Sequence, residues 1–296
     1  MNFLRNRLVL SCSLILYTLL LTAALLYFRF PAEKLKLSCQ LRLEQLLSVN
    51  HCTIGQLSYH FPFSMVANEI QFSSRTGEGG QLVTVDQAIL TPALTSPKSR
   101  FLVTLNACGG KHDFALILNR TENEFTLKDI RLRDLDLAQL PFLRQATARE
   151  ITGSLEGSGT YHGIRKNGKY ETDGQGTITL SKGSFGLLYP ILSLKNIDLQ
   201  SFQADISLQG DDLKFSNGTF SGQELKGDFS GILGLKTGLA TSSLAFQGKL
   251  DPLPPLLKKS KHAKNMVNQL KKQRNQTGLP FRLNGVVQKP SFRFSP

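Results

Sequence analysis

Apolar and polar residues alternate along most of the chain from about residue 53 onward, in short segments about 8–15 residues apart. A period of two is typical of a β-strand with one apolar face and one polar face. The pattern therefore predicts an antiparallel sheet crossed by hairpins, whose apolar face packs against a helix, a second sheet or the same sheet curled over. The alternating apolar residues are Phe101, Val103 and Leu105, then Phe114, Leu116 and Leu118, then Phe202, Ala204, Ile206 and Leu208, then Leu213 and Phe215, and finally Leu244 and Phe246.

Turn-forming residues separate these segments. Glycine, asparagine and aspartate tolerate the backbone conformations that tight turns need. We expect turns at Gly109-Gly110, at residues 210–212, at Asn217-Gly218 and at Gly248.

The N-terminal region differs from the rest. Residues 8–28 contain no charged side chain, and at about 1.5 Å per residue a helix of this length spans roughly 30 Å, the thickness of the hydrocarbon core of a bilayer. The run is longer than the apolar part of a cleavable signal peptide, and it ends in Leu-Leu-Tyr-Phe rather than in small residues. It predicts an uncleaved transmembrane helix preceded by a cytoplasmic head of residues 1–7, with the remainder across the membrane. Residues 29–50 then form a linker with an amphipathic helix, in which Leu35, Cys39 and Leu43 lie on one face.

Two further short helices are expected within the β-rich region of residues 51–296. Residues 137–148 form one, interrupted by Pro141, and residues 255–274 form the other. The second carries apolar residues that can pack on the sheet and a strongly basic face. That face is either solvated or in contact with an anionic surface, such as lipid head groups or an acidic partner. Its basic residues are Lys258, Lys259, Lys261, Lys264, Lys271, Lys272 and Arg274.

The net charge of +13 arises mostly at the C-terminus. The last acidic residue is Asp251, and ten basic residues follow it, so the preceding part of the chain carries only about +3. A nucleic-acid-binding domain would spread its cations over the folded body and interleave them with aromatic residues. We therefore expect no nucleic-acid partner.

Candidate chemistry is sparse. The five histidines do not stand at metal-ligand spacing, and no nucleophile is accompanied by a base. The chain is therefore predicted to be no enzyme and to hold no metal or cofactor. Asp134-Leu135-Asp136 is read as two solvated carboxylates, and the glycines of residues 153–159 as thin positions on a strand. Cys39 and Cys52 can form a disulfide or remain as two buried free thiols.

Four segments together resemble a known family. They are HFPFSMVANEIQF at residues 60–72, ITGSLEGSGTY at 151–161, LKGDFSG at 225–231 and GLPFRLNGVVQKP at 278–290. With the N-terminal anchor, this order resembles the longer form of the GspN family of type II secretion accessory proteins, which is itself similar to AsmA-like envelope proteins. The resemblance implies a single-pass inner-membrane protein with a periplasmic, groove-like β-sheet and no catalytic residues.

Two functions follow as hypotheses. In the first, the chain is a non-catalytic accessory component of the type II secretion system that contacts other components of that machinery. In the second, it is an AsmA-like protein whose curled sheet binds or transfers phospholipid acyl chains for envelope maintenance.

Overall fold

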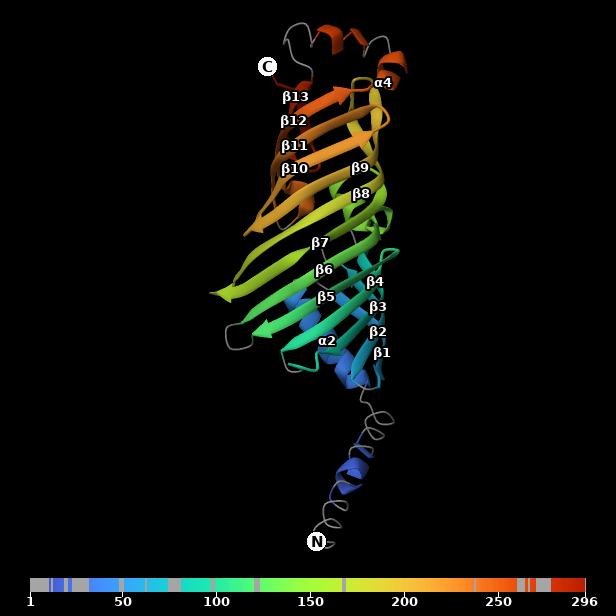
Figure 1. Cartoon of the computed structure of the whole chain (residues 1–296), viewed down its shortest axis with the longest axis vertical. Helices are drawn as coiled ribbons and strands as arrows, with labels where there is room; N and C mark the ends of the chain where they lie inside the picture. The colour runs from blue at the N-terminus through green and yellow to red at the C-terminus, as the bar shows by residue number, and fades with distance from the viewer. Residues whose placement is uncertain are drawn as a thin grey trace, which may run out of the picture.

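The computed structural model describes residues 11, 13–18, 21–22, 32–47, 51–61, 63–73, 81–96, 99–119, 123–166, 169–236, 238–259, 264–265, 267–269 and 278–295. Most of the described chain forms one antiparallel sheet of fourteen strands, as the alternating pattern predicts (Figure 1). Each strand pairs only with its neighbours in the sequence, from β1 to β14 without a crossover. The strands are β1 His51–His60, β2 Ser64–Ser73, β3 Gln81–Pro92, β4 Arg100–Ala107, β5 Gly110–Asn119, β6 Glu124–Asp136, β7 Ile151–Lys166, β8 Lys169–Ile191, β9 Leu194–Gln209, β10 Asp212–Gly222, β11 Leu225–Gly234, β12 Ser243–Pro252, β13 Leu279–Val286 and β14 Pro290–Phe294.

One face of the sheet carries a continuous apolar row from β5 to β12. Residues opposite each other on paired strands lie on the same face, so the register can be followed across the sheet. One such row is apolar or glycine at every position: Leu116, Leu127, Tyr161, Gly174, Leu208, Leu213, Leu233 and Leu244.

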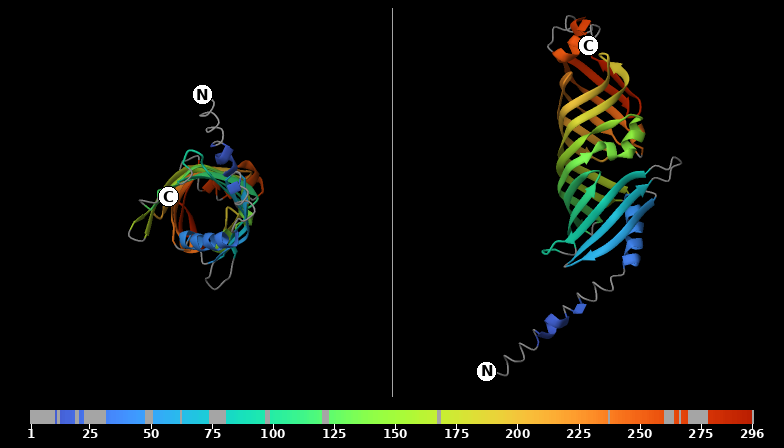
Figure 2. Two further views of the ribbon diagram at one scale, coloured as in Figure 1. Left: turned by 90° about the horizontal axis from the view of Figure 1, so that it is seen from below. Right: turned by 90° about the vertical axis from the view of Figure 1, so that its right-hand side faces the viewer.

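The sheet curls around its long axis, as the view along that axis shows (Figure 2). Tyr161, Gly174, Leu208 and Leu213 of the apolar row line an interior cavity, so this face is the inner one. Strand twist contributes to the curl, and β-bulges increase it. The pairing of β6 with β7 contains two register shifts, and shifts also occur between β7 and β8 and between β8 and β9. The expectation of a mainly β protein with a curved antiparallel sheet is therefore confirmed.

Helices cover the inner face at the β1 end. Helix α2 (Ala32–Leu47) packs along β1, and Cys39 and Leu43 contact a cluster of buried residues. Residues 137–148 form a 3-10 turn, η1 (Leu137–Gln139), and helix α3 (Pro141–Thr147). Pro141 begins α3 rather than interrupting it, because the first helical position needs no N–H donor. The buried residues of this N-terminal cluster are Cys52, Ile54, Ile70, Val85, Ala107, Cys108 and Leu140.

A second cluster closes the opposite end of the curled sheet. Helix α4 (Pro254–Lys259) places Leu256 against the inner face, and the helical residue Val267 joins it. Both side chains are about 1% exposed, so these two apolar residues of the basic segment pack in the interior. The C-terminal cluster consists of Leu192, Leu194, Leu225, Leu250, Leu256, Val267, Leu279 and Phe281.

Two of the four expected turns are wrong. Turns do occur after β4, at Cys108 and Gly109, and after β9, at Gly210 and Asp211. Asn217-Gly218 instead forms a bulge within β10, where the register to β9 and β11 shifts and Asn217 adopts a φ of 51°. Gly248 lies in the middle of β12, opposite Phe229.

Within the described part of the chain, no helix has both the length and the apolar character needed to cross a bilayer. The predicted span of residues 8–28 lies mostly outside that part, since only 11, 13–18 and 21–22 are described there. The membrane helix and the head of residues 1–7 therefore remain predictions.

Candidate functional site

The inner face of the sheet forms an apolar cavity of about 710 Å³ beside the C-terminal cluster. Folded interiors contain few voids larger than a water molecule, whereas small-molecule sites are about 300–1,000 Å³. The volume is thus that of a binding site and not of a packing defect. Strands β8, β9, β13 and β14 provide most of the lining, including Phe185, Leu187, Ile191, Ile197, Leu199, Phe202, Leu283, Phe292 and Phe294.

A second apolar cavity of about 230 Å³ lies further along the same face. Strand β9 lines both: Leu199 and Phe202 face the larger cavity, and Ile206 and Leu208 face the smaller one. Stacked and tilted aromatic rings follow the inner face beside them, with Phe202 and Phe229 5.1 Å apart and Phe215 and Phe246 5.3 Å apart. The hollow interior therefore presents an extended apolar surface rather than a single isolated pocket.

The larger cavity has one hydrophobic rim that reaches solvent. Leu188 and Tyr189, near the end of β8, line the cavity and are 46% and 73% exposed. Large apolar side chains exposed together commonly mark a surface that contacts an apolar partner. An apolar molecule can therefore enter past this end of β8.

Two arginines, Arg149 and Arg293, border the larger cavity, and the side chain of Arg293 lies on the outer face opposite Arg282. Arg149 lies on the connection from α3 to β7, and its Nη2 donates a hydrogen bond of 3.1 Å to the backbone oxygen of Gln288. Its Nε is buried without a hydrogen-bond partner among the described residues. Burial lowers the pKa of the Arg149 guanidinium, which nevertheless stays protonated.

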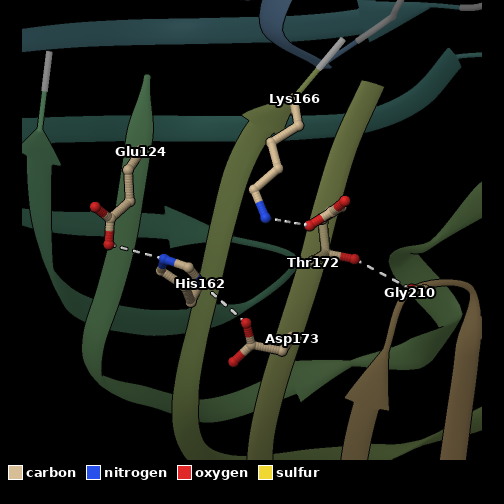
Figure 3. A network of polar contacts seen from close by, with 7 residues as sticks. Glu124, His162, Lys166, Thr172, Asp173 and Gly210 are labelled. Carbon is tan, nitrogen blue, oxygen red and sulfur yellow. Dashed lines mark hydrogen bonds and ion pairs between the residues drawn. The ribbon is translucent and has the colours of Figure 1, made fainter. Parts of the chain in front are cut away.

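The outer face carries a polar cluster that spans three strands (Figure 3). His162 on β7 bonds through Nε2 to Glu124 on β6 and through Nδ1 to Asp173 on β8, both at 2.8 Å. Lys166 and Glu171 form an ion pair nearby. These contacts join adjacent strands on the face opposite the cavity, so we interpret the cluster as structural.

Hydrogen bonds that His162 donates to the carboxylates of Asp173 and Glu124 raise the pKa of His162. An imidazole whose two nitrogens both face carboxylates is stabilised in its charged form. The cluster therefore places His162 between two carboxylates on the outer surface, where its charged form is favoured.

Of the two states left open for Cys39 and Cys52, the structure shows free thiols, and Cys108 is also free. The structure therefore does not contain a disulfide between Cys39 and Cys52. Burial raises the pKa of all three thiols, which disfavours the reactive thiolate form. The three cysteines act as small apolar residues around the N-terminal cluster.

The structure describes three of the seven basic residues predicted for the C-terminal surface. Lys258, Lys259 and Lys264 are exposed, and Lys259 forms an ion pair of 3.0 Å with Glu224. Lys261, Lys271, Lys272 and Arg274 lie outside the described residues. Contact of this segment with an anionic surface remains a prediction.

Asp134 and Asp136 lie at the end of β6, and Asp136 caps η1 by accepting a hydrogen bond from the N–H of Ala138. Among the described residues, no group of three or more histidines, cysteines or carboxylates could hold a metal ion. The absence of catalysis and of a cofactor remains a prediction.

Sequence reasoning missed the two most informative polar contacts. Arg149 and Gln288 are 139 positions apart, and His162 and Glu124 are 38 apart, so no local spacing brings them together. The alternating pattern did identify several inward-facing residues, including Phe202, Ile206 and Leu208, but not the cavity they line.

The chain matches no protein-family model, no curated protein and no solved structure in comparisons with all three. The resemblance to the GspN family accordingly rests on the sequence segments alone.

Proposed function

We propose that this chain is a non-catalytic, membrane-anchored envelope protein whose curled sheet binds the acyl chain of a membrane amphiphile. The observation that carries the proposal is the apolar cavity of about 710 Å³, which lies beside the C-terminal cluster and is bordered by exposed apolar residues of β8. Each methylene group that moves from water into such surroundings gains about 0.8 kcal/mol. A chain of ten or so methylenes therefore suffices for stable binding.

The predicted N-terminal anchor supports the same proposal. A single apolar helix would hold the sheet beside the bilayer from which such an amphiphile comes. We propose an inner-membrane location with a cytoplasmic N-terminus and a periplasmic sheet. A periplasm-active reporter fused to the C-terminus tests this orientation, and activity only for a cytoplasmic reporter would contradict it.

Lipid extraction followed by mass spectrometry tests acyl-chain binding. Full-length protein, purified gently in a nonionic detergent, is expected to carry co-purified lipid. Leu283 faces the cavity, whereas its neighbour Arg282 is exposed on the outer face. We expect Leu283→Gln to lower the bound lipid about fivefold or more, because its amide loses hydrogen bonds to water when an acyl chain enters.

Arg282→Gln is the matched control and is expected to retain wild-type lipid. Thermal unfolding of both variants checks that the sheet is intact. Wild-type protein that carries no lipid, or equal lipid in the two variants, would overturn the proposal.

A second proposal comes from the sequence resemblance: the chain is an accessory component of the type II secretion system that acts through contacts with other components. Two of the four resembling segments lie in β7 and β11, where their glycines belong to the inner face. This second proposal therefore requires the same curled sheet.

Comparison of the medium and the periplasm of a parent strain and a deletion strain separates the two proposals. Secreted enzymes that accumulate in the periplasm of the deletion strain would favour the secretion role. Unchanged export together with a leaky or lipid-altered outer membrane would favour acyl-chain binding alone.

A further inference from the structure

The rim of the larger cavity carries positive charge without a matching carboxylate. Arg149 lines the cavity and no acidic residue does. Arg293 also borders the cavity on β14, but it pairs with Arg282, so its side chain is exposed on the outer face and does not contribute charge to the cavity. None of the ion pairs found within the described ranges includes Arg149. The cavity is thus apolar in its walls and cationic at its edge.

The guanidinium of Arg149 lies across the boundary between solvent and the cavity. Its Nη2 makes an exposed hydrogen bond to the Gln288 oxygen, whereas its Nε is buried and unpaired within the described structure. A buried donor without an acceptor is costly, and such groups in folded proteins commonly indicate a missing water, ion or ligand. The Nε edge of arginine matches the geometry of a carboxylate or phosphate.

Local backbone contacts hold Arg149 in this position. Ala148 ends α3 in the left-handed conformation, and the Thr147 hydroxyl bonds to both the backbone N–H and the backbone oxygen of Arg149. The side chain is therefore placed at the rim before any ligand arrives, which reduces the entropy cost of binding.

We propose that Arg149 binds the anionic head group of an amphiphile, a carboxylate or phosphate, while the acyl chain occupies the cavity lined by Phe185, Leu199 and Phe292. This inference rests on the proposed acyl-chain binding and adds the class of ligand. It predicts discrimination between anionic and neutral molecules that have the same tail.

Photocrosslinking of the full-length protein in a maltoside detergent tests the inference. Two probes share one diazirine-bearing sixteen-carbon chain, and one is the fatty acid while the other is the fatty alcohol. The wild type is expected to bind the acid about tenfold or more tightly than the alcohol, since hydrogen bonds to a charged group are strong. Crosslinked peptides are expected from β8, β9, β13 or β14.

Arg149→Gln is expected to weaken binding of the acid about tenfold and to leave binding of the alcohol within about twofold of wild type. Arg144→Gln on the exposed side of α3 is the matched control, with both affinities unchanged. Arg149→Lys keeps the charge without the planar fork, and we expect it to retain a smaller preference for the acid. The lysine variant still tests the charge if the glutamine variant does not fold.

The outcomes distinguish acyl-chain binding from the binding of the head group by Arg149. If neither probe labels the wild type, acyl-chain binding itself is overturned. If both probes bind the wild type equally, or if Arg149→Gln weakens both by the same factor, acyl-chain binding stands and the head-group role of Arg149 is overturned. A lysophosphatidic acid competitor that displaces the fatty acid, when free phosphate does not, would show that the head group must carry an acyl chain.

Discussion

At the scale of single residues, glycines on the inner face lie beneath aromatic rings of neighbouring strands. A Cβ atom added to Gly231 would lie 2.5 Å from Cδ1 of Phe246, and one added to Gly227 would lie 2.6 Å from Cζ of Phe220. The missing side chain lets each ring lie flat over the backbone of the adjacent strand. This arrangement explains why glycine and phenylalanine recur along β10 to β12.

Gly231→Ala tests this packing. The added methyl would also lie 2.5 Å from the backbone oxygen of Ala245, so the strands must shift, and we expect a loss of about 1–3 kcal/mol in the free energy of unfolding. Gly238→Ala is the control, because its new methyl group would meet only Thr241 at 3.7 Å. Urea denaturation that shows equal effects for the two variants would contradict the packing argument.

The second prediction at the residue scale concerns the contribution of His162 to stability. The carboxylates of Asp173 and Glu124 raise its pKa in the folded state above the value of about 6.5 in the unfolded chain. A group with a raised folded pKa stabilises the fold fully below the unfolded pKa, and its contribution is lost as the pH rises through the folded pKa.

We therefore expect His162→Gln to destabilise the protein near pH 6 and to approach wild-type stability as the pH rises above the raised pKa. Urea denaturation of both proteins across this pH range measures the difference. A gap in unfolding free energy that stays constant with pH would show that the charge of His162 does not matter.

At the scale of elements, α2 stabilises the sheet with one face only. Leu43 packs against the N-terminal cluster, whereas Leu37 and Leu41 are 59% and 52% exposed. This division follows the four-residue spacing of Leu35, Cys39 and Leu43 in the sequence.

Leu43→Ala is expected to lower the free energy of unfolding by about 1–2 kcal/mol, less than for a fully buried leucine because the side chain is only partly buried. Leu41→Ala removes the same atoms from the exposed face, and we expect a change within about 0.5 kcal/mol. Denaturation curves of the two variants measure the contrast, and equal losses would mean that α2 does not dock through its Leu43 face.

At the scale of the whole molecule, the fold resembles a linear array, since every strand contacts mainly its neighbours in sequence. The N-terminal and C-terminal clusters share no residue and lie at opposite ends of the sheet. In such arrays stability is approximately a sum of local and neighbour contributions. The two ends are therefore expected to respond separately to mutation.

Phe292→Ala tests this independence. The ring stacks on Phe281 at 5.5 Å and contacts Phe294 at 5.1 Å. We expect its removal to lower the protection of amides from hydrogen exchange in β11 to β14 and to leave β1 to β5 unchanged. Equal loss of protection at both ends would show that the sheet unfolds as one cooperative unit.

The sequence by itself determined the local elements of this protein. Strand alternation depends only on which residues point to each side of a chain, so β4, β5, β9, β10 and β12 could be recognised from their apolar residues alone. The helix at α2 and helical structure within residues 137–148 were visible for the same reason, because their signals span only a few residues, although Pro141 begins α3 and does not interrupt a longer helix.

Only the tertiary structure decided how these elements combine. The same kind of residue that makes a turn at Gly210 makes a bulge at Gly218, because pairing with both neighbouring strands continues past it. The hollow interior depends on the twist and the bulges of all fourteen strands together. The resulting curvature of the sheet cannot be predicted from a short sequence segment. Arg149 reaches Gln288 and the cavity rim only after the sheet has curled, which is why the head-group site could not be predicted from the residues around it.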